Sequence, residues 1–275
     1  MFNFLDVIPD GGVWVEMLGY VLAGLLLFLW AWFWLVDNLR KYHQCRLSGK
    51  PEEFRSSAAL ASIPLIGRFS RIHFEGHVVI PVICIFGLIE GSLDNSFWGN
   101  YFLLIPRSLI ILLVFYSSKG VMPCGSIHAA TGVAFILQLS TFLLPMYWKR
   151  LDHLVDHALI SASWFLSGCC AFVEIFHRNQ IMPTVGRCYF LMLSGVYMFH
   201  KGIMGKSLGP HSEDVNPMVQ EVIQTSHYFA FDAGMLMFIV GLTSVCVSKT
   251  VARASQGSDR EGEVFMHLFE QALDD

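Results

Sequence analysis

The stretch LGYVLAGLLLFLWAWFWLV, residues 18–36, decides the fold class of this chain. It carries no charged side chain and has the length of about 20 residues that a helix needs to cross the hydrocarbon core of a bilayer. The whole chain of 275 residues is 54% hydrophobic and only 15% charged, whereas soluble domains carry about 25% charged residues. Charges collect between apolar stretches, because a charge inside hydrocarbon costs several kcal/mol. The sequence therefore predicts an integral membrane protein.

Seven apolar segments of this kind can be delimited, and we expect each to be a transmembrane helix. They are Val13–Val36, Ile72–Gly91, Tyr101–Tyr116, Ile127–Trp148, Leu154–Phe176, Thr184–Met204 and Thr225–Val247. The predicted fold is an all-α, polytopic membrane helix bundle in residues 1–248, followed by a cytosolic tail in residues 249–275. We expect the tail to begin as a loose segment. Its last stretch, EVFMHLFEQALDD, has apolar residues on one helical face, so it is either a short membrane-surface or partner-binding helix or, as we favour, a partly ordered tail.

The distribution of Lys and Arg predicts the orientation of the bundle. Thirteen of these residues, Arg187 included, fall on the side of the first loop, and four, Lys201 included, fall on the other side. Because cytosolic loops carry the excess of positive charge, the N-terminus should be lumenal or extracellular and the C-terminus cytosolic. Residues 1–12 contain no Lys or Arg, so we do not expect them to begin a secretory signal.

Ionisable residues inside the predicted helices are candidates for a functional site, because they are expensive in a bilayer. The segment LDHLVDHAL, residues 151–159, places His153 and His157 on one helical face, and Glu174 lies five turns beyond Asp156. The full candidate cluster is Glu90, Glu174, His227, His157, His153, His200 and Arg107, with Glu90 the expected partner of Arg107. We expect the acids and His227 to face the bundle interior.

A divalent metal ion is the cofactor that these residue types would suit, since histidine and carboxylate side chains are common metal ligands. The candidate ligands are His153, His157, His200 and His227. Interfacial His and Asp also occur without any ligand, so no cofactor is expected and packing is the alternative role. Motifs for a nucleophile elbow, a phosphate-binding loop and a dinucleotide fold are absent, and no basic stripe suggests nucleic acid.

Several segments together resemble the transmembrane protein 45 family, over roughly residues 63–245. They are LDHLVDHALI at 151–160, SGCCAFVEIFHRN at 167–179, LSGVYMFHKG at 193–202 and SHYFAF at 226–231. Glu75, Gly87 and Glu90 also match, whereas Gln138 and Tyr147 depart from the pattern. The resemblance implies seven spans, a Golgi, endolysosomal or plasma membrane location, and no agreed catalytic residues.

Three functional hypotheses follow. The first is a membrane protein that is not an enzyme and acts through membrane or cytosolic protein partners in trafficking or signalling. The second is a transporter or proton-coupled carrier that uses Glu90, Glu174 and His227. The third is a metal-dependent intramembrane enzyme. Acids and histidines that converge at one depth would favour the last two hypotheses, and individually paired side chains would favour the first.

Overall fold

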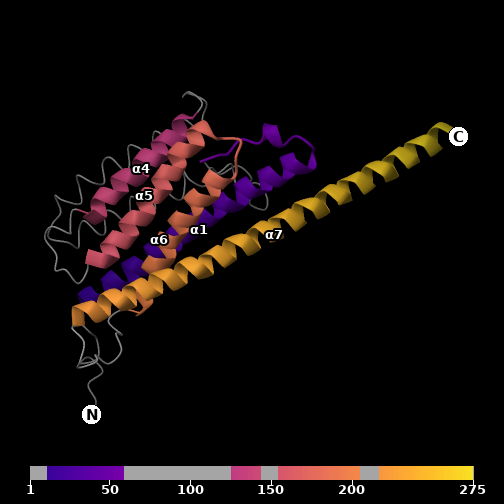
Figure 1. The fold of residues 1–275 in the computed structure, drawn as a ribbon. Helices are drawn as coiled ribbons and strands as arrows, with labels where there is room; N and C mark the ends of the chain where they lie inside the picture. The colour runs from indigo at the N-terminus through magenta and orange to yellow at the C-terminus, as the bar shows by residue number, and fades with distance from the viewer. Residues whose placement is uncertain (1–10, 59–124, 144–153, 205–216, 275) are drawn as a thin grey trace, which may run out of the picture.

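The computed structural model describes residues 11–58, 125–143, 154–204 and 217–274 (Figure 1). These ranges contain five α-helices, a short 3-10 helix and no strand. The helices are α1 (Gly11–Leu47), η2 (Pro51–Glu53), α4 (Ser126–Leu143), α5 (Leu154–Phe176), α6 (Met182–Met204) and α7 (Pro217–Asp274). The all-α fold class is confirmed for this part of the chain, and the helices expected at 72–91 and 101–116 lie outside the described residues.

Three helical stretches of the described chain are long and apolar enough to cross a membrane, which supports an integral membrane protein. They are Tyr20–Leu47, Val155–Phe176 and Val222–Gln256. Helix α6 coincides with a predicted span but is not among the three. It lies between other helices, with Leu191, Met192 and Ser194 fully buried. Because much of α6 faces protein and not lipid, this helix can be less hydrophobic than the other spans.

Helix α1 continues three turns beyond the predicted end at Val36 and stops at Leu47. The extension contains neither Gly nor Pro, and Lys41 Nζ lies 2.5 Å from Asp37 Oδ2 one turn earlier, a spacing that supports helix. Gly49 then ends the helix with a φ of 71°. The Lys50 amide donates to the Cys45 carbonyl at 3.0 Å, which is the bond pattern of a glycine C-cap. The boundary prediction was wrong because charged residues are good helix formers outside the membrane.

Helices α5 and α6 form an antiparallel hairpin, since only His177–Ile181 separates them. Their observed bounds lie within two residues of the predicted ones. Pro183 occupies the first turn of α6, where its missing N–H removes no helical hydrogen bond. Helix α7 is a single helix of 58 residues, so the loose segment expected after Ser248 is not found.

The helices lie side by side in the order α4, α5, α6 and α1, and α7 runs along α1 and α6 (Figure 1). Glycines set the distance between α1 and α6. A Cβ atom added at Gly24 would lie 2.5 Å from the Gly195 carbonyl oxygen, and one added at Gly195 would lie 2.7 Å from the Gly24 oxygen. The two backbones therefore touch, as small residues permit in membrane helices.

Aromatic side chains link α1, α4 and α5 across the core. The Trp34 ring lies 6.4 Å from Phe135, and the Phe135 ring lies 5.2 Å from Trp164 in an edge-on arrangement, a geometry that aromatic pairs favour. All three side chains are buried and belong to one core cluster with Leu191 and Leu236. This cluster packs α1, α4 and α5 against α6 and α7.

Candidate functional site

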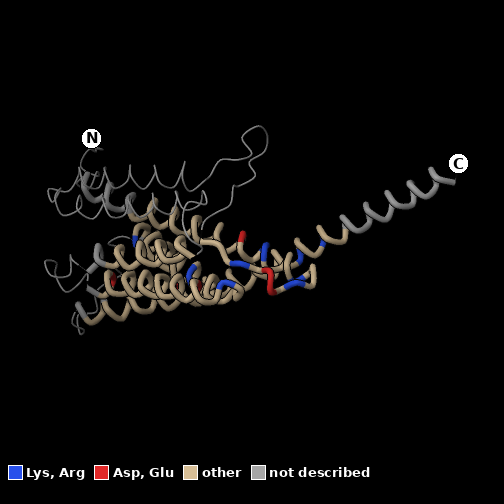
Figure 2. The backbone as a smooth tube through the Cα atoms, turned by 90° about the horizontal axis from the view of Figure 1, so that it is seen from above, with Lys and Arg blue, Asp and Glu red and all other residues tan. Residues whose placement is uncertain are grey.

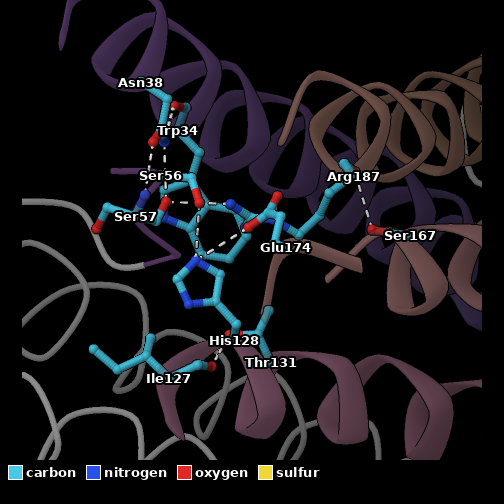
Figure 3. Close-up of polar contacts among 10 residues, drawn as sticks. All are labelled: Trp34, Asn38, Ser56, Ser57, Ile127, His128, Thr131, Ser167, Glu174 and Arg187. Carbon is cyan, nitrogen blue, oxygen red and sulfur yellow. Dashed lines mark hydrogen bonds and ion pairs between the residues drawn. The ribbon is translucent and has the colours of Figure 1, made fainter. Parts of the chain in front are cut away.

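A buried cluster of ionisable side chains joins α4, α5 and α6 near the C-terminal end of α1 (Figure 3). Arg187 Nε donates to Glu174 Oε1 at 3.0 Å, and His128 Nε2 lies 3.2 Å from Glu174 Oε2. Glu174 and Arg187 are fully buried and His128 is 2% exposed. Because removing such charges from water costs several kcal/mol per ion, they are tolerated only when they pair with one another.

The Arg187 guanidinium contacts two helices and the segment after η2. Its central carbon lies 4.5 Å from the centre of the Trp34 ring on α1, within the range of a cation–π interaction. Its Nη2 donates to the Ser57 carbonyl at 3.2 Å. The Arg187 backbone carbonyl accepts from Ser167 Oγ at 2.9 Å. One side chain thus connects α6 to α1, α5 and the segment after η2.

The segment 54–58 is inserted into this end of the bundle. Asn38 on α1 binds Ser57 twice, since its Oδ1 accepts from the Ser57 amide at 2.8 Å and its Nδ2 donates to the Ser57 carbonyl at 3.0 Å. The Ser56 amide donates to the Arg178 carbonyl at 2.8 Å. Phe54 and Ala58 are each 1% exposed. Backbone groups that would otherwise be buried without partners are therefore satisfied.

The geometry of His128 does not match that of an activated nucleophile. Ser56 Oγ lies 3.4 Å from His128 Nε2, the same ring nitrogen that contacts Glu174. In a Ser–His–acid arrangement, the hydroxyl and the acid contact opposite nitrogens of the ring. Here both contacts fall on one ring nitrogen, so Glu174 does not orient the ring from the far side of the nucleophile. The cluster can clamp helices together, but it does not activate a serine.

A second polar cluster lies at the opposite end of α5 and α6. Asp156 accepts hydrogen bonds from the Tyr197 hydroxyl and from Lys201 Nζ. His200 Nδ1 lies 3.2 Å from both carboxylate oxygens of Asp232 on α7. The adjacent α6 residues His200 and Lys201 thus bind acids on opposite sides of the helix. Lys201 binds Asp156 on α5, and His200 contacts Asp232 on α7.

The structure brings together only part of the predicted candidate cluster. Glu174 and His157 are buried and His200 is half-buried. Glu174 belongs to the first polar cluster and His200 to the second, while His157 follows Asp156 of the second cluster along α5. His227 is exposed among the described residues, and its interior position stays a prediction because two of the expected helices lie outside those residues. The described part of the chain contains no group of three His, Cys, Asp or Glu suited to a metal ion. Glu90, Arg107 and His153 lie outside the described residues.

The sequence reasoning missed two cations because it counted them as loop charges. Arg187 and Lys201 both lie within α6 and bind Glu174 and Asp156. The signal was available, since a lone Arg in an apolar helix requires a buried acid, but this reasoning was applied to Arg107 instead. Removing both residues from the loop counts leaves twelve cations against three, so the predicted orientation keeps its basis.

The fold and these paired polar groups define the class of the protein: an α-helical integral membrane protein whose described interior charges are matched within the bundle. Its sequence matches no protein-family model and no curated protein.

Proposed function

We propose that this chain is a seven-span membrane protein, with a lumenal N-terminus and a cytosolic C-terminus, that acts by binding a cytosolic protein through the projecting part of α7. The observation that carries the proposal is the length of α7, which extends well past the other helices in Figure 1. The 27 residues after Val247 correspond to about 40 Å of helix. Its first turn still packs on the bundle, since Val251 is 8% exposed, and the helix then continues beyond the ends of the other described helices (Figure 1).

The sequence of the projecting part suits a protein partner. Val264, Phe265, Leu268, Phe269 and Ala272 share one helical face by their spacing, and Glu263, Glu270 and Asp274 fall on the opposite face. An isolated helix of this length is marginal in water unless its apolar face packs against something. Residues 257–275 contain six acids and one Arg, so the partner that fits is a protein with an apolar groove and a basic rim.

The pairing of the interior charges also supports a role through partners. Glu174 is occupied by Arg187 and His128, and Asp156 is occupied by Lys201 and Tyr197. Side chains paired in this way serve packing, which is the pattern that favours the first of the three hypotheses. The carrier hypothesis joined Glu174 to His227, and no contact between these two residues supports it.

We further propose that the chain is a distant member of the transmembrane protein 45 family and resides in Golgi, endolysosomal or plasma membranes. The support comes from the segments around Glu174, Gly195 and His227, whose order and spacing resemble those of the family. Imaging of the full chain beside markers of each membrane tests the location. A protein confined to mitochondria or the nucleus would contradict it.

Site-specific crosslinking tests the proposed partner surface. A photoreactive amino acid is placed at Phe265 in the full chain, and membranes from expressing cells are irradiated. We expect one discrete adduct with a cytosolic protein, and we expect L268D to abolish it because a charge on the apolar face prevents packing. The matched control is H267A, whose position lies on the other face of the helix and whose adduct should persist.

Three outcomes would contradict the proposal. They are the absence of an adduct, an adduct that survives L268D, and an adduct whose mass equals two copies of this chain. The last result would identify α7 as a self-association helix instead of a docking site.

A further inference from the structure

Five exposed cations surround the end of the bundle from which α1 and α7 emerge. They are Arg40 and Arg46 on α1, Arg55 after η2, and Lys249 and Arg253 on α7. We call this set the basic collar. Figure 2 shows the Lys and Arg positions gathered at this end. The nearby cations Lys41 and Lys50 are bound by Asp37 and Glu53, whereas no described acid forms an ion pair with a member of the collar.

Two members of the collar, Arg40 and Lys249, lie at the depth expected for lipid headgroups. Trp32 Nε1 on α1 lies 3.5 Å from Thr243 Oγ1 on α7, which sets a common level for two helices that run in the same direction (Figure 1). At 1.5 Å per residue, the last apolar residue of the predicted first span, Val36, lies about 6 Å beyond that level. Lys249, Arg40 and Arg253 then lie about 3, 6 and 9 Å beyond Val36. The headgroup layer of one leaflet is about 5–8 Å thick.

The opposite end of the bundle has no comparable charge among the described residues. Lys201 is the one cation there, and Asp156 binds it inside the bundle. The collar is therefore a one-sided feature of the described chain. Long cationic side chains at this depth can reach phosphate and carboxylate groups, while their stems remain against the apolar helices.

We propose that the basic collar binds anionic lipid headgroups of the leaflet on its side of the membrane. The ligand class is a glycerophospholipid with net negative charge, such as phosphatidylserine or a phosphoinositide. Each cation near such a surface strengthens binding about fivefold. The collar would hold the end of the bundle at a fixed depth and would enrich anionic lipid around the exit of α7.

Native mass spectrometry of the full-length protein in detergent tests this binding. The protein is titrated with phosphatidylserine and with phosphatidylcholine of the same acyl chains, and bound lipids are counted. We expect tighter binding of phosphatidylserine and a loss of about 25-fold in the R40Q/K249Q variant, with no change for phosphatidylcholine. The control K149Q/R150Q, which removes two charges from a loop predicted on the other side, should behave like the parent protein.

A second variant excludes a trivial loss of folding. E52Q/E53Q removes two exposed acids beside the collar, so it should strengthen binding of phosphatidylserine. Equal binding of the two lipids by the parent protein would overturn the proposal, as would an unchanged affinity in R40Q/K249Q. Competition by millimolar inorganic phosphate would assign the collar to a free anion and would also overturn it.

Discussion

Replacement of Arg187 by Met should destabilise the bundle strongly, because it leaves Glu174 charged and buried. Met keeps the unbranched stem of Arg but lacks the guanidinium end, so the change removes the charge while retaining part of the packing. The side chain lost makes a 3.0 Å hydrogen bond to Glu174, a 3.2 Å bond to the Ser57 carbonyl and a contact with the Trp34 ring at 4.5 Å. Both charged residues are fully buried.

The expected loss follows from the burial of the pair. Breaking a buried ion pair by removing one partner costs about 3–5 kcal/mol, most of it from the uncompensated charge that remains. His128 stays 3.2 Å from Glu174, so the lower half of this range is expected. For a protein of this size, such a loss corresponds to a fall in Tm of about 6–16 °C.

A double-mutant cycle separates the charge effect from the loss of packing. E174L and R187M are made singly and together, and thermal unfolding in detergent is followed by circular dichroism. We expect the double variant to be more stable than R187M alone, because no buried charge remains unpaired. A fall of less than 2 °C in R187M, or additive effects in the double variant, would refute the reasoning.

Three further predictions follow from other contacts. Gly24→Ala should separate α1 from α6 and cost about 1–3 kcal/mol by overpacking, measured by thermal unfolding, whereas Gly241→Ala, with open space around its Cβ position, should be neutral. Asn38→Ala should release the segment 54–58 and speed tryptic cleavage at its exposed arginine, while Gln44→Ala should not; equal cleavage rates would refute the role of the asparagine. His157→Ala should leave the divalent metal content of the purified protein unchanged, and metal lost with this change would revive the metal site.

The apolar segments predicted the bounds of α5 and α6 well. For α5 the reason is that the hydrophobic length matches what a bilayer requires, whereas α6 is not apolar enough by itself to be such a span. The ends of α1 and α7 were not predictable in the same way. Beyond the membrane, the point at which a helix ends depends on helix propensity and capping. For α1 the only sequence signal of the end is one glycine, Gly49. Helix α7 likewise continues through the polar residues 252–262. Apolar residues do not recur there at helical spacing, so the sequence does not predict a helix in this stretch.

The candidate site was predicted only in part. Burial of Glu174 was expected from its position in an apolar helix, but its partner was not. His128 lies on α4 and Arg187 on α6, whereas Glu174 lies on α5. Only the packing of these three helices brings the side chains together. Sequence spacing identifies residues on one helical face, whereas contacts between helices depend on packing that spacing does not contain.

We propose that this chain crosses the membrane with its N-terminus lumenal and its C-terminus, at the end of α7, cytosolic. Protease protection of terminal tags in sealed vesicles tests it most directly. We expect protease added outside vesicles of cytosolic-side-out orientation to remove a C-terminal tag and to leave an N-terminal tag intact until detergent is added. A protected C-terminal tag, or full release of the protein by alkaline carbonate, would contradict the account.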